Sequence, residues 1–305
     1  KAGIQWRWES FGEYTRYLES IPLGPNVGAH VGHCAMRVHA MGERGVKDEK
    51  ATPADIAAMQ ELLREAMRGG ALGVSTSRTT GHKTPAGEVV PGTFAAADEL
   101  MALGQVLAEF NAGVFELAPF GATGEAAGGT LGELEWMEAV ARASARPVRF
   151  GLVQNQNHPD DWRAVLARVE EARARGAQVV PEVGARGVGI LLSEANLSPL
   201  LVFPGAGEYM GLEKPELLAA LRKPEVRRAL CASLDETGGK ILAGYGHVDT
   251  VFDWRDEGEL SYETLRPNSL VARAEREGRH VGEVLIDLML ERELGGFFYI
   301  PIFNQ

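Results

Sequence analysis

The chain has little cysteine, no long apolar run and an excess of negative charge, and each of these features excludes a class of protein. Its two cysteines, Cys34 and Cys231, lie far apart in the 305-residue sequence, so they form neither a disulfide framework nor a zinc-type spacing. No apolar run reaches the roughly 18 residues that cross a membrane, and no signal peptide is recognisable. We therefore expect two reduced cysteines in a cytoplasmic protein that has no membrane partner.

The net charge of −11 argues against a nucleic-acid partner, because such a partner requires a basic face. The sequence also lacks a G-x-S-x-G elbow, a P-loop and a dinucleotide-binding fingerprint. The hydrophobic fraction of 45% is ample for a core. These limits leave a globular protein with a small-molecule substrate, with or without assembly into a homo-oligomer.

Helices alternate with short apolar strands along the first part of the chain. This alternation is typical of βα units around a parallel sheet, and strands without polar alternation indicate a sheet covered on both faces. We predict an α/β fold, an incomplete (β/α)8 TIM-type barrel with parallel strands and surrounding helices, in preference to a doubly wound sheet. The expected strands are 26–33, 72–75, 113–117, 147–153 and 178–183, and the helices are 7–20, 53–67, 96–110, 131–143 and 160–175.

The pattern is looser after residue 183. Residues 184–212 are rich in Gly, Pro and small apolar side chains, which predicts a long loop with short elements. Residues 248–254 are a possible sixth strand, and 300–305 form an apolar, strand-like tail. Because no linker or repeat divides the chain, we expect a single barrel-type domain over residues 1–305. The further helices are expected at 215–221, 224–235, 269–277 and 281–291.

The loop after the strand at 72–75 is a candidate wall of a binding site, because ligands collect at the carboxyl ends of parallel strands. Ser75, Ser77, Arg78 and His82 supply hydroxyls, a bidentate cation and an imidazole that could bind a polar substrate. A solvated loop without a ligand is the competing interpretation. Gln154, in a run of amides after another strand, is a further substrate-binding candidate or part of a capped loop.

Three side chains are candidate metal ligands. His30 and His33 flank a strand-to-loop turn with Cys34, and imidazole and thiolate suit zinc. Their spacing is one residue longer than the His-x-His of barrel hydrolases, so histidines that position a loop are the alternative. Glu116 lies in an apolar strand, where a carboxylate is costly unless it is paired, bound to metal or catalytic. Glu182 is placed similarly.

Several sequence motifs, taken together, resemble those of a divergent branch of the N-acyl-D-amino-acid deacylases (D-aminoacylases) of the amidohydrolase superfamily. The resemblance covers nearly the whole chain and is most specific between residues 26 and 100. It is carried by Trp8 to Leu18, Asn26-Val27 through Val31-Gly32-His33, Met36-Arg37, Met41-Gly42, Met59 to Met67, Gly70 to Ser77, Arg78, His82-Lys83, Gly87-Glu88-Val89, Val90-Pro91-Gly92-Thr93 and Asp98-Glu99-Leu100.

The resemblance implies a barrel hydrolase that uses zinc or another divalent metal to cleave the amide of N-acyl-D-amino acids. In such an enzyme the metal lowers the pKa of a water while a carboxylate moves the proton. The family's His-x-His is expected before Lys1 and its catalytic Asp after Gln305, so the chain is expected to be incomplete at both ends. The strand-end histidines of the family would align near Ala118 and Leu152.

Two functions of different classes follow from these patterns. The first is the central part of a metal-dependent amidohydrolase that deacylates N-acyl-D-amino acids. The second is a non-catalytic barrel that has lost its metal site and binds a small acidic ligand or a partner chain. The missing strand-end histidines favour the second function, and the family motifs favour the first. In either case, open barrel edges would favour an assembly that covers them.

Overall fold

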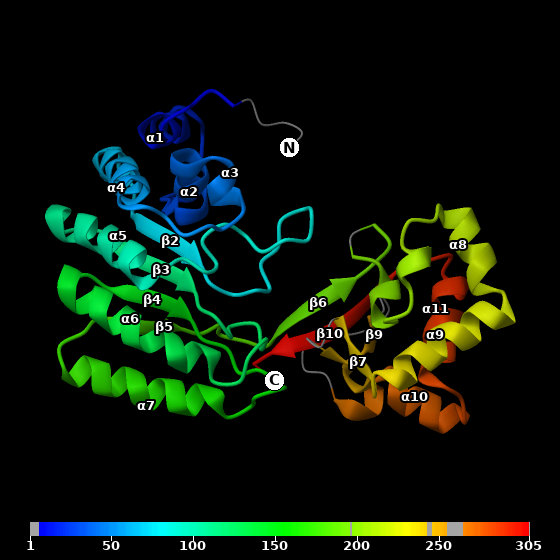
Figure 1. Ribbon diagram of the computed structural model, residues 1–305. Coiled ribbons are helices and arrows are strands. Elements are labelled where there is room, and N and C mark those ends of the chain that lie inside the picture. Colours follow the sequence, from blue (N-terminus) through cyan, green and yellow to red (C-terminus); the bar gives the residue numbers. More distant parts are fainter. Residues whose placement is uncertain (1–5, 196, 243–245, 255–264, 305) are drawn as a thin grey trace. The chain divides into compact units, whose positions relative to one another are not determined.

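The chain divides into two compact units, which Figure 1 shows as a ribbon. The computed structural model describes residues 6–195, 197–242, 246–254 and 265–304. The first unit comprises Lys1–Val153 and His158–Val183, and the second comprises Gln154–Asn157 and Gly184–Gln305. The βα units expected from the sequence all fall in the first unit. A single barrel-type domain over residues 1–305 stays a prediction.

The first unit is built on a five-stranded parallel sheet whose strands follow one another in chain order. Such an order has no reversal point, so the sheet is singly wound, as in part of a (β/α)8 barrel, and not doubly wound. The predicted α/β fold with parallel strands is confirmed. The strands are β1 (Val31–Gly32), β2 (Gly73–Ser77), β3 (Val114–Ala118), β4 (Val148–Gly151) and β5 (Val179–Glu182).

Helices connect these strands and pack beside one another in chain order (Figure 1). Right-handed crossovers between successive neighbours bring the connecting helices to the same face of a sheet. Two shorter helices, α2 and α3, lie where the sequence analysis expected only a loop. The helices are α1 (Phe11–Ser20), α2 (His33–Met41), α3 (Glu43–Val46), α4 (Pro53–Arg68), α5 (Ala97–Phe110), α6 (Gly129–Ser144) and α7 (Asp161–Ala174).

Helix α4 begins and ends where its sequence signals predict. Thr52 accepts a hydrogen bond from the backbone N–H of Asp55, and the Asp55 side chain accepts one from the Thr52 backbone, so the two form a reciprocal cap. Pro53 occupies the first helical turn, where its missing N–H costs nothing. Gly69 ends the helix, and the chain enters β2 four residues later. These local signals place the start of β2, and with it the loop that follows β2.

The two faces of the parallel sheet differ in exposure. Val74, Phe115, Val148, Phe150 and Val179 are fully buried among apolar side chains of the helices. The alternate residues of β2, β3 and β4 are half-buried or exposed. The expectation that both faces are covered is therefore wrong for these strands. The polar side chains that interrupt the strands gather on the less buried face.

The second unit contains an antiparallel sheet in the order β6-β10-β9. The sixth-strand prediction at 248–254 is corrected, because residues 248–250 form a turn of 3-10 helix and only β9 pairs, in the antiparallel sense, with β10. The predicted apolar tail at 300–305 overlaps β10, the central strand of this sheet, in which Phe298, Tyr299 and Ile300 are buried. The strands are β6 (Val188–Leu192), β7 (Lys240–Ile241), β8 (Gly246–His247), β9 (Phe252–Trp254) and β10 (Phe297–Phe303).

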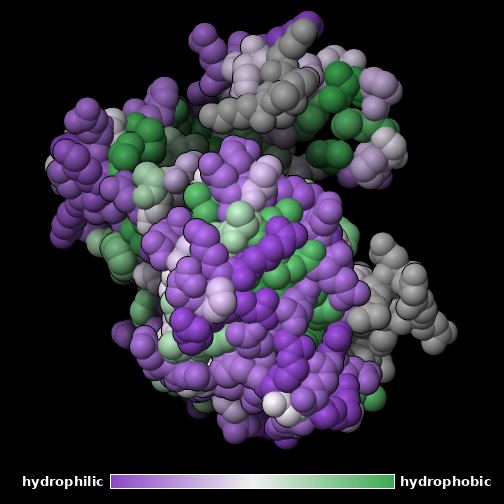
Figure 2. Space-filling model, turned by 90° about the vertical axis from the view of Figure 1, so that its right-hand side faces the viewer, coloured by the Kyte–Doolittle hydropathy of each residue, from purple (hydrophilic) through white to green (hydrophobic). Residues whose placement is uncertain are grey.

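Four helices and several short 3-10 turns complete the second unit, and the four helices agree with the sequence prediction to within one or two residues. Figure 2 presents a face of this unit that is largely hydrophilic, with hydrophobic surface showing between the polar side chains. No helix in the described ranges is long and apolar enough to cross a membrane. The helices are α8 (Lys214–Leu221), α9 (Pro224–Glu236), α10 (Leu270–Glu277) and α11 (Val281–Glu291).

Gly73 is a residue at which the close approach of two strands leaves no room for a side chain. Its φ is +135°, and a Cβ added there would lie 2.0 Å from the carbonyl oxygen of Val114 on β3. We expect Gly73→Ala to lower the free energy of unfolding by about 2 kcal/mol or more, because it combines a disfavoured φ with a backbone clash. Thermal and urea denaturation followed by circular dichroism would measure the change.

Gly70→Ala is the matched control for this prediction. Gly70 also has a positive φ, +92°, but open space surrounds the position of its Cβ. Its cost should therefore be that of the backbone conformation alone, about 1 kcal/mol. If Gly73→Ala were no more destabilising than Gly70→Ala, the close approach of β2 to β3 would not be as described.

Candidate functional site

A row of polar side chains crosses the less buried face of the parallel sheet. Ser75 on β2 is in register with Glu116 on β3, and Glu116 is in register with Arg149 on β4. Residues in register on parallel strands point to the same face. The Glu116 carboxylate has no hydrogen bond or ion pair within the described chain. Nη1 of Arg149 lies 2.9 Å from Oε1 of Glu182 at the end of β5.

Ser77 and His82 lie next to this row, where β2 passes into the following loop. Ser77 is two residues after Ser75 and so shares its face of the sheet. Its Oγ is 2.7 Å from Nδ1 of His82. The loop that brings His82 back to the strand contains a one-pair antiparallel bridge between Lys83 and Val89. The structure therefore brings together four of the expected residues, namely Ser75, Ser77, His82 and Glu116.

Arg78 is engaged elsewhere. Its guanidinium binds the carboxylate of Glu133 on α6, with Nε 2.8 Å from Oε2 and Nη2 3.2 Å from Oε1. Its Nη1 donates to the carbonyl oxygen of Ala95 at 2.6 Å. Both side chains of the ion pair are largely buried. Arg78 therefore connects the loop after β2 to α6. Its role as a substrate ligand stays a prediction.

Glu125 holds the same loop from the other side. Its Oε1 accepts hydrogen bonds from the Thr79 hydroxyl and the Thr80 backbone N–H, at 2.6 and 3.1 Å. Its Oε2 accepts two from the hydroxyl and backbone N–H of Thr123. Burial raises the pKa of the Glu125 carboxyl, but hydrogen bonds to the charged form lower it by more than burial raises it. The pKa is therefore below its ordinary value. The loop that carries His82 is therefore anchored to the loop after β3.

His33 lies on the opposite, helix-covered side of the sheet. It is fully buried at the start of α2, not in the loop that its sequence suggested. Its Nε2 is 2.7 Å from Oε1 of Glu99 on α5, and its Nδ1 is 2.9 Å from Oγ1 of Thr76 on β2. Because an ionised carboxylate can only accept, Nε2 carries the proton and Nδ1 is left to accept from Thr76 in the neutral ring.

Arg37 binds the same carboxylate one helical turn further along α2. Its Nη1 is 2.6 Å from each oxygen of Glu99, and its Nη2 is 3.3 Å from Oδ1 of Asp48. Asp48 in turn accepts hydrogen bonds from the backbone N–H groups of Gly92 and Phe94, at 2.7 and 2.8 Å. We call His33, Arg37, Asp48, Thr76 and Glu99 the buried polar network. It joins α2, β2 and α5 to the end of the loop that carries His82.

The charge of Glu99 survives burial because of its partners. Burial raises the pKa of the carboxyl, but the hydrogen bonds from His33 and Arg37 outweigh this effect and leave the pKa below its ordinary value. Two formal charges, on Arg37 and Glu99, are thus buried at 1% exposure each. They are directly paired, which is the condition under which buried charges are tolerated, although Nε of Arg37 has no hydrogen-bond partner among the described residues.

A model of the "Amidohydrolase family" matches residues 2–286, which is most of the chain. The chain belongs to the amidohydrolase family. This agrees with the resemblance to the amidohydrolase superfamily that the motifs between residues 26 and 100 indicate.

Two curated relatives of this amidohydrolase share a short segment with it. D-aminoacylase of Alcaligenes xylosoxydans xylosoxydans is 38% identical over 74 residues, 24% of this chain and 15% of the relative. N-acyl-D-aspartate deacylase of the same organism is 43% identical over 70 residues, 23% of this chain and 14% of the relative. A solved D-aminoacylase, described with a binuclear metal center, has a TM-score of 0.49 and 20% identity, covering 97% of this chain and 47% of that chain. The amidohydrolase therefore spans about half the length of that structure.

The described residues of this chain do not fit a bound metal. Within those ranges, no three His, Cys, Asp or Glu side chains come together as ligands. Both ring nitrogens of His33 are already used, and its partner Thr76 points away from the face that bears Glu116. His30 lies in a separate cleft between α1, β1, α2 and α4. The three expected metal ligands, His30, His33 and Glu116, are thus not brought together.

Gln154 belongs to the second unit. Its backbone N–H donates to the side-chain oxygen of Asn304, beyond β10, and its carbonyl oxygen accepts from the backbone N–H of Asn304.

Arg149, Glu99 and Arg37 were not predicted from the sequence to belong to a polar cluster. A charged residue in the middle of an apolar strand was the available signal for Arg149, and it was used only for Glu116 and Glu182.

The buried polar network predicts a pH-dependent stability. A folded-state pKa of Glu99 below its ordinary value of 4.5 contributes stability that is complete above that pH and is lost as the pH falls through the folded-state pKa. Glu99→Gln should remove this contribution and leave Arg37 buried without its charged partner. We expect a loss of about 3 kcal/mol at neutral pH and a weaker dependence on pH below about 4.5, measured by urea denaturation.

Glu277→Gln is the control, because it removes an exposed carboxylate that pairs with Arg273 and Arg279 at the surface, where ion pairs contribute little. It should leave the stability at neutral pH nearly unchanged. Equal losses for the two variants would contradict the buried polar network.

Proposed function

We propose that this amidohydrolase belongs to an enzyme that hydrolyses the amide C–N bond of N-acyl-D-amino acids, and that the row of Ser75, Glu116 and Arg149 lines the substrate. The observation that carries the proposal is this row, a carboxylate without a partner between a hydroxyl and a guanidinium on the open face of an amidohydrolase sheet. The partial similarity to D-aminoacylase and N-acyl-D-aspartate deacylase supports the substrate class.

Each side chain on this face of the sheet has a separate part in the reaction. Hydrolysis breaks the C–N bond, adds the oxygen of water to the acyl carbon and transfers a proton to the departing amine. Arg149 uses only Nη1 toward Glu182 within the described residues, so the rest of its fork is open to a substrate carboxylate. Glu116 carries the proton between water and amine. Ser75, Ser77 and His82 donate or accept hydrogen bonds at the same edge.

Zinc or another divalent metal, which the family resemblance implies, has no ligand set among the described residues. The same observation favours a second candidate function, a barrel that binds an N-acylated or other small acidic ligand without cleaving it. The two functions share the binding row and differ in turnover.

Incubation with N-acetyl-D-glutamate, with and without added Zn²⁺, distinguishes them. Release of free D-glutamate, and none from the L enantiomer, is the result that we expect. Saturable binding by calorimetry without release of amino acid would replace the hydrolase with the binding function. Absence of both binding and release would contradict both functions.

Arg149→Gln tests the assignment of the row. It should weaken binding of N-acetyl-D-glutamate about tenfold, because a charge-assisted hydrogen bond contributes roughly 1.5 kcal/mol or more. Glu116→Gln should reduce kcat about a hundredfold with a smaller change in KM. Arg173→Gln, which removes an exposed charge from the end of α7, is the control and should bind and react as the parent does. An unchanged affinity in Arg149→Gln would place the substrate elsewhere.

A further inference from the structure

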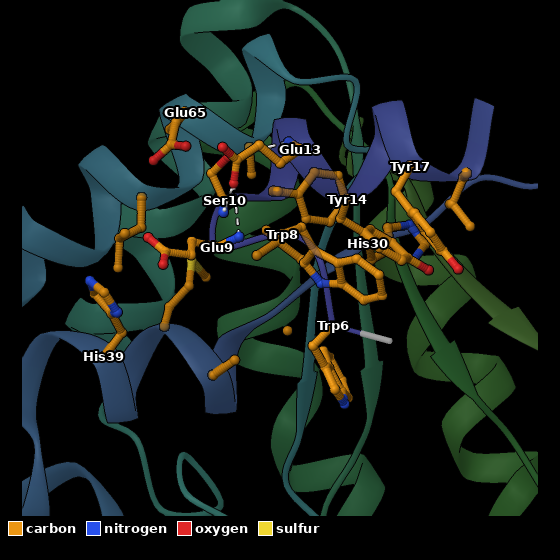
Figure 3. A pocket seen from close by; sticks show the side chains of 18 of the residues that line it. Trp6, Trp8, Glu9, Ser10, Glu13, Tyr14, Tyr17, His30, His39 and Glu65 are labelled. Atoms are coloured by element: carbon orange, nitrogen blue, oxygen red, sulfur yellow. Dashed lines mark hydrogen bonds between the residues drawn. The ribbon is translucent and has the colours of Figure 1, made fainter. Parts of the chain in front are cut away.

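A cleft of about 970 Å³ lies between α1, β1, α2 and α4, and the polar row on the sheet face does not line it. Figure 3 shows the side chains around this cleft. Its volume is within the range of small-molecule sites. Its walls include aromatic side chains that none of the functions above uses. The cleft is lined by Trp6, Trp8, Glu9, Ser10, Phe11, Glu13, Tyr14, Tyr17, Leu18, Ile21, His30, Val31, Gly32, Ala35, Met36, His39, Leu62, Glu65 and Ala66.

Trp8 is the centre of the aromatic wall. Its ring centroid is 5.1 Å from that of Trp6, 5.2 Å from that of Tyr14 and 4.8 Å from that of Tyr17, with tilted planes. Helix α1 supplies the two tyrosines, and none of its residues is fully buried. Half-exposed aromatic rings gain from a ligand that covers them, since each ring buries a large apolar area.

Carboxylates also line the cleft. In Figure 3, the side chains of Glu9 and Glu65 lie on the opposite side of the view from the rings of Trp8 and Tyr14. Neither carboxylate has an ion pair or hydrogen bond within the described chain. Glu13 adds a third negative charge, because it caps α1 through the backbone N–H groups of Glu9 and Ser10, and these hydrogen bonds lower the pKa of its carboxyl.

The described residues that line the cleft include three glutamates and two histidines but no lysine or arginine. The cleft therefore disfavours anions and attracts cations. Aromatic faces attract a cation through the negative face of the ring, and the attraction grows as the cation loses water. An inorganic ion would use the carboxylates alone, whereas the rings require a cation with an apolar body.

We propose that this cleft binds an organic cation, an amine or quaternary ammonium group attached to an apolar body, attracted by the negative charges of Glu9 and Glu65 and by the aromatic face of Trp8. The proposed substrate of the sheet face is an anion. This site is therefore additional to the proposed function and does not depend on it.

Benzyltrimethylammonium is the probe, and its neutral carbon isostere neopentylbenzene is the matched ligand. Tryptophan fluorescence and calorimetry should detect binding of the cation at millimolar or lower concentration. Binding of the isostere should be about tenfold weaker, because it has the same shape without the charge. Equal or tighter binding of the isostere would make the cleft an apolar docking surface and would overturn the proposal, as would no binding of the cation at millimolar concentration.

Two variants locate the site. Trp8→Leu should abolish detectable binding of the cation. Glu65→Gln, at an exposed position without a partner, should keep the fold and weaken binding about fivefold through loss of one nearby charge. Glu61→Gln is the control, because Glu61 is on the same helix but pairs with Arg64 and Arg68 outside the cleft. The affinity of this variant for benzyltrimethylammonium should match that of the unsubstituted protein. Parental affinity in Glu65→Gln would overturn the proposal even if Trp8→Leu failed to fold.

Discussion

The arrangement of the first unit depends on keeping one carboxylate ionised in its interior. Glu99 is 1% exposed, and a buried carboxylate is tolerated only with close, well-oriented partners. His33 and Arg37 are those partners, both from α2. Their commitment to Glu99 fixes α2 against α5 and, through Thr76, against β2. Asp48 extends the same set of contacts to the backbone at Gly92 and Phe94.

This constraint separates two roles on the two faces of the parallel sheet. Thr76 points into the helix-covered layer, where it binds His33, whereas its neighbours Ser75 and Ser77 point to the other face with Glu116. A strand that alternates in this way can be held rigidly by one face while it presents chemistry on the other. The anchors at Arg78 and Glu125 hold the loop after β2 and so keep His82 within hydrogen-bond distance of Ser77.

Much of this fold could be predicted from local signals. The capping residues Thr52 and Asp55, the glycines that end α4 and the recurrent apolar strands predicted the βα units and their parallel order. The helix at His33 was missed because a buried His and a buried Arg interrupt its apolar face, and only long-range partners make them core residues. The pairing of β9 and β10 was also missed, because strand direction depends on segments far apart in the chain.

The candidate site, like the fold, could be predicted from local signals only in part. Sequence position identifies which residues follow a strand, so Ser75, Ser77 and His82 were predicted as one candidate wall, whereas Glu116 was predicted separately as a possible metal ligand. It does not reveal which charges find partners in three dimensions, so the ion pair between Arg78 and Glu133 was not predicted, and Arg149 was not singled out. The same limit made His33 look like a possible metal ligand, because its contacts with Glu99 and Thr76 span 66 and 43 residues of sequence.

The most direct test of this account is ¹⁵N NMR of the histidine side chains, with His33 assigned by substitution and Zn²⁺ then added. His33 should keep its contacts with Glu99 and Thr76, so we expect its resonances to stay unchanged when zinc is present. A His33 signal that moves or broadens with zinc would contradict the account, because it would mean that the ring leaves Glu99 to bind the metal.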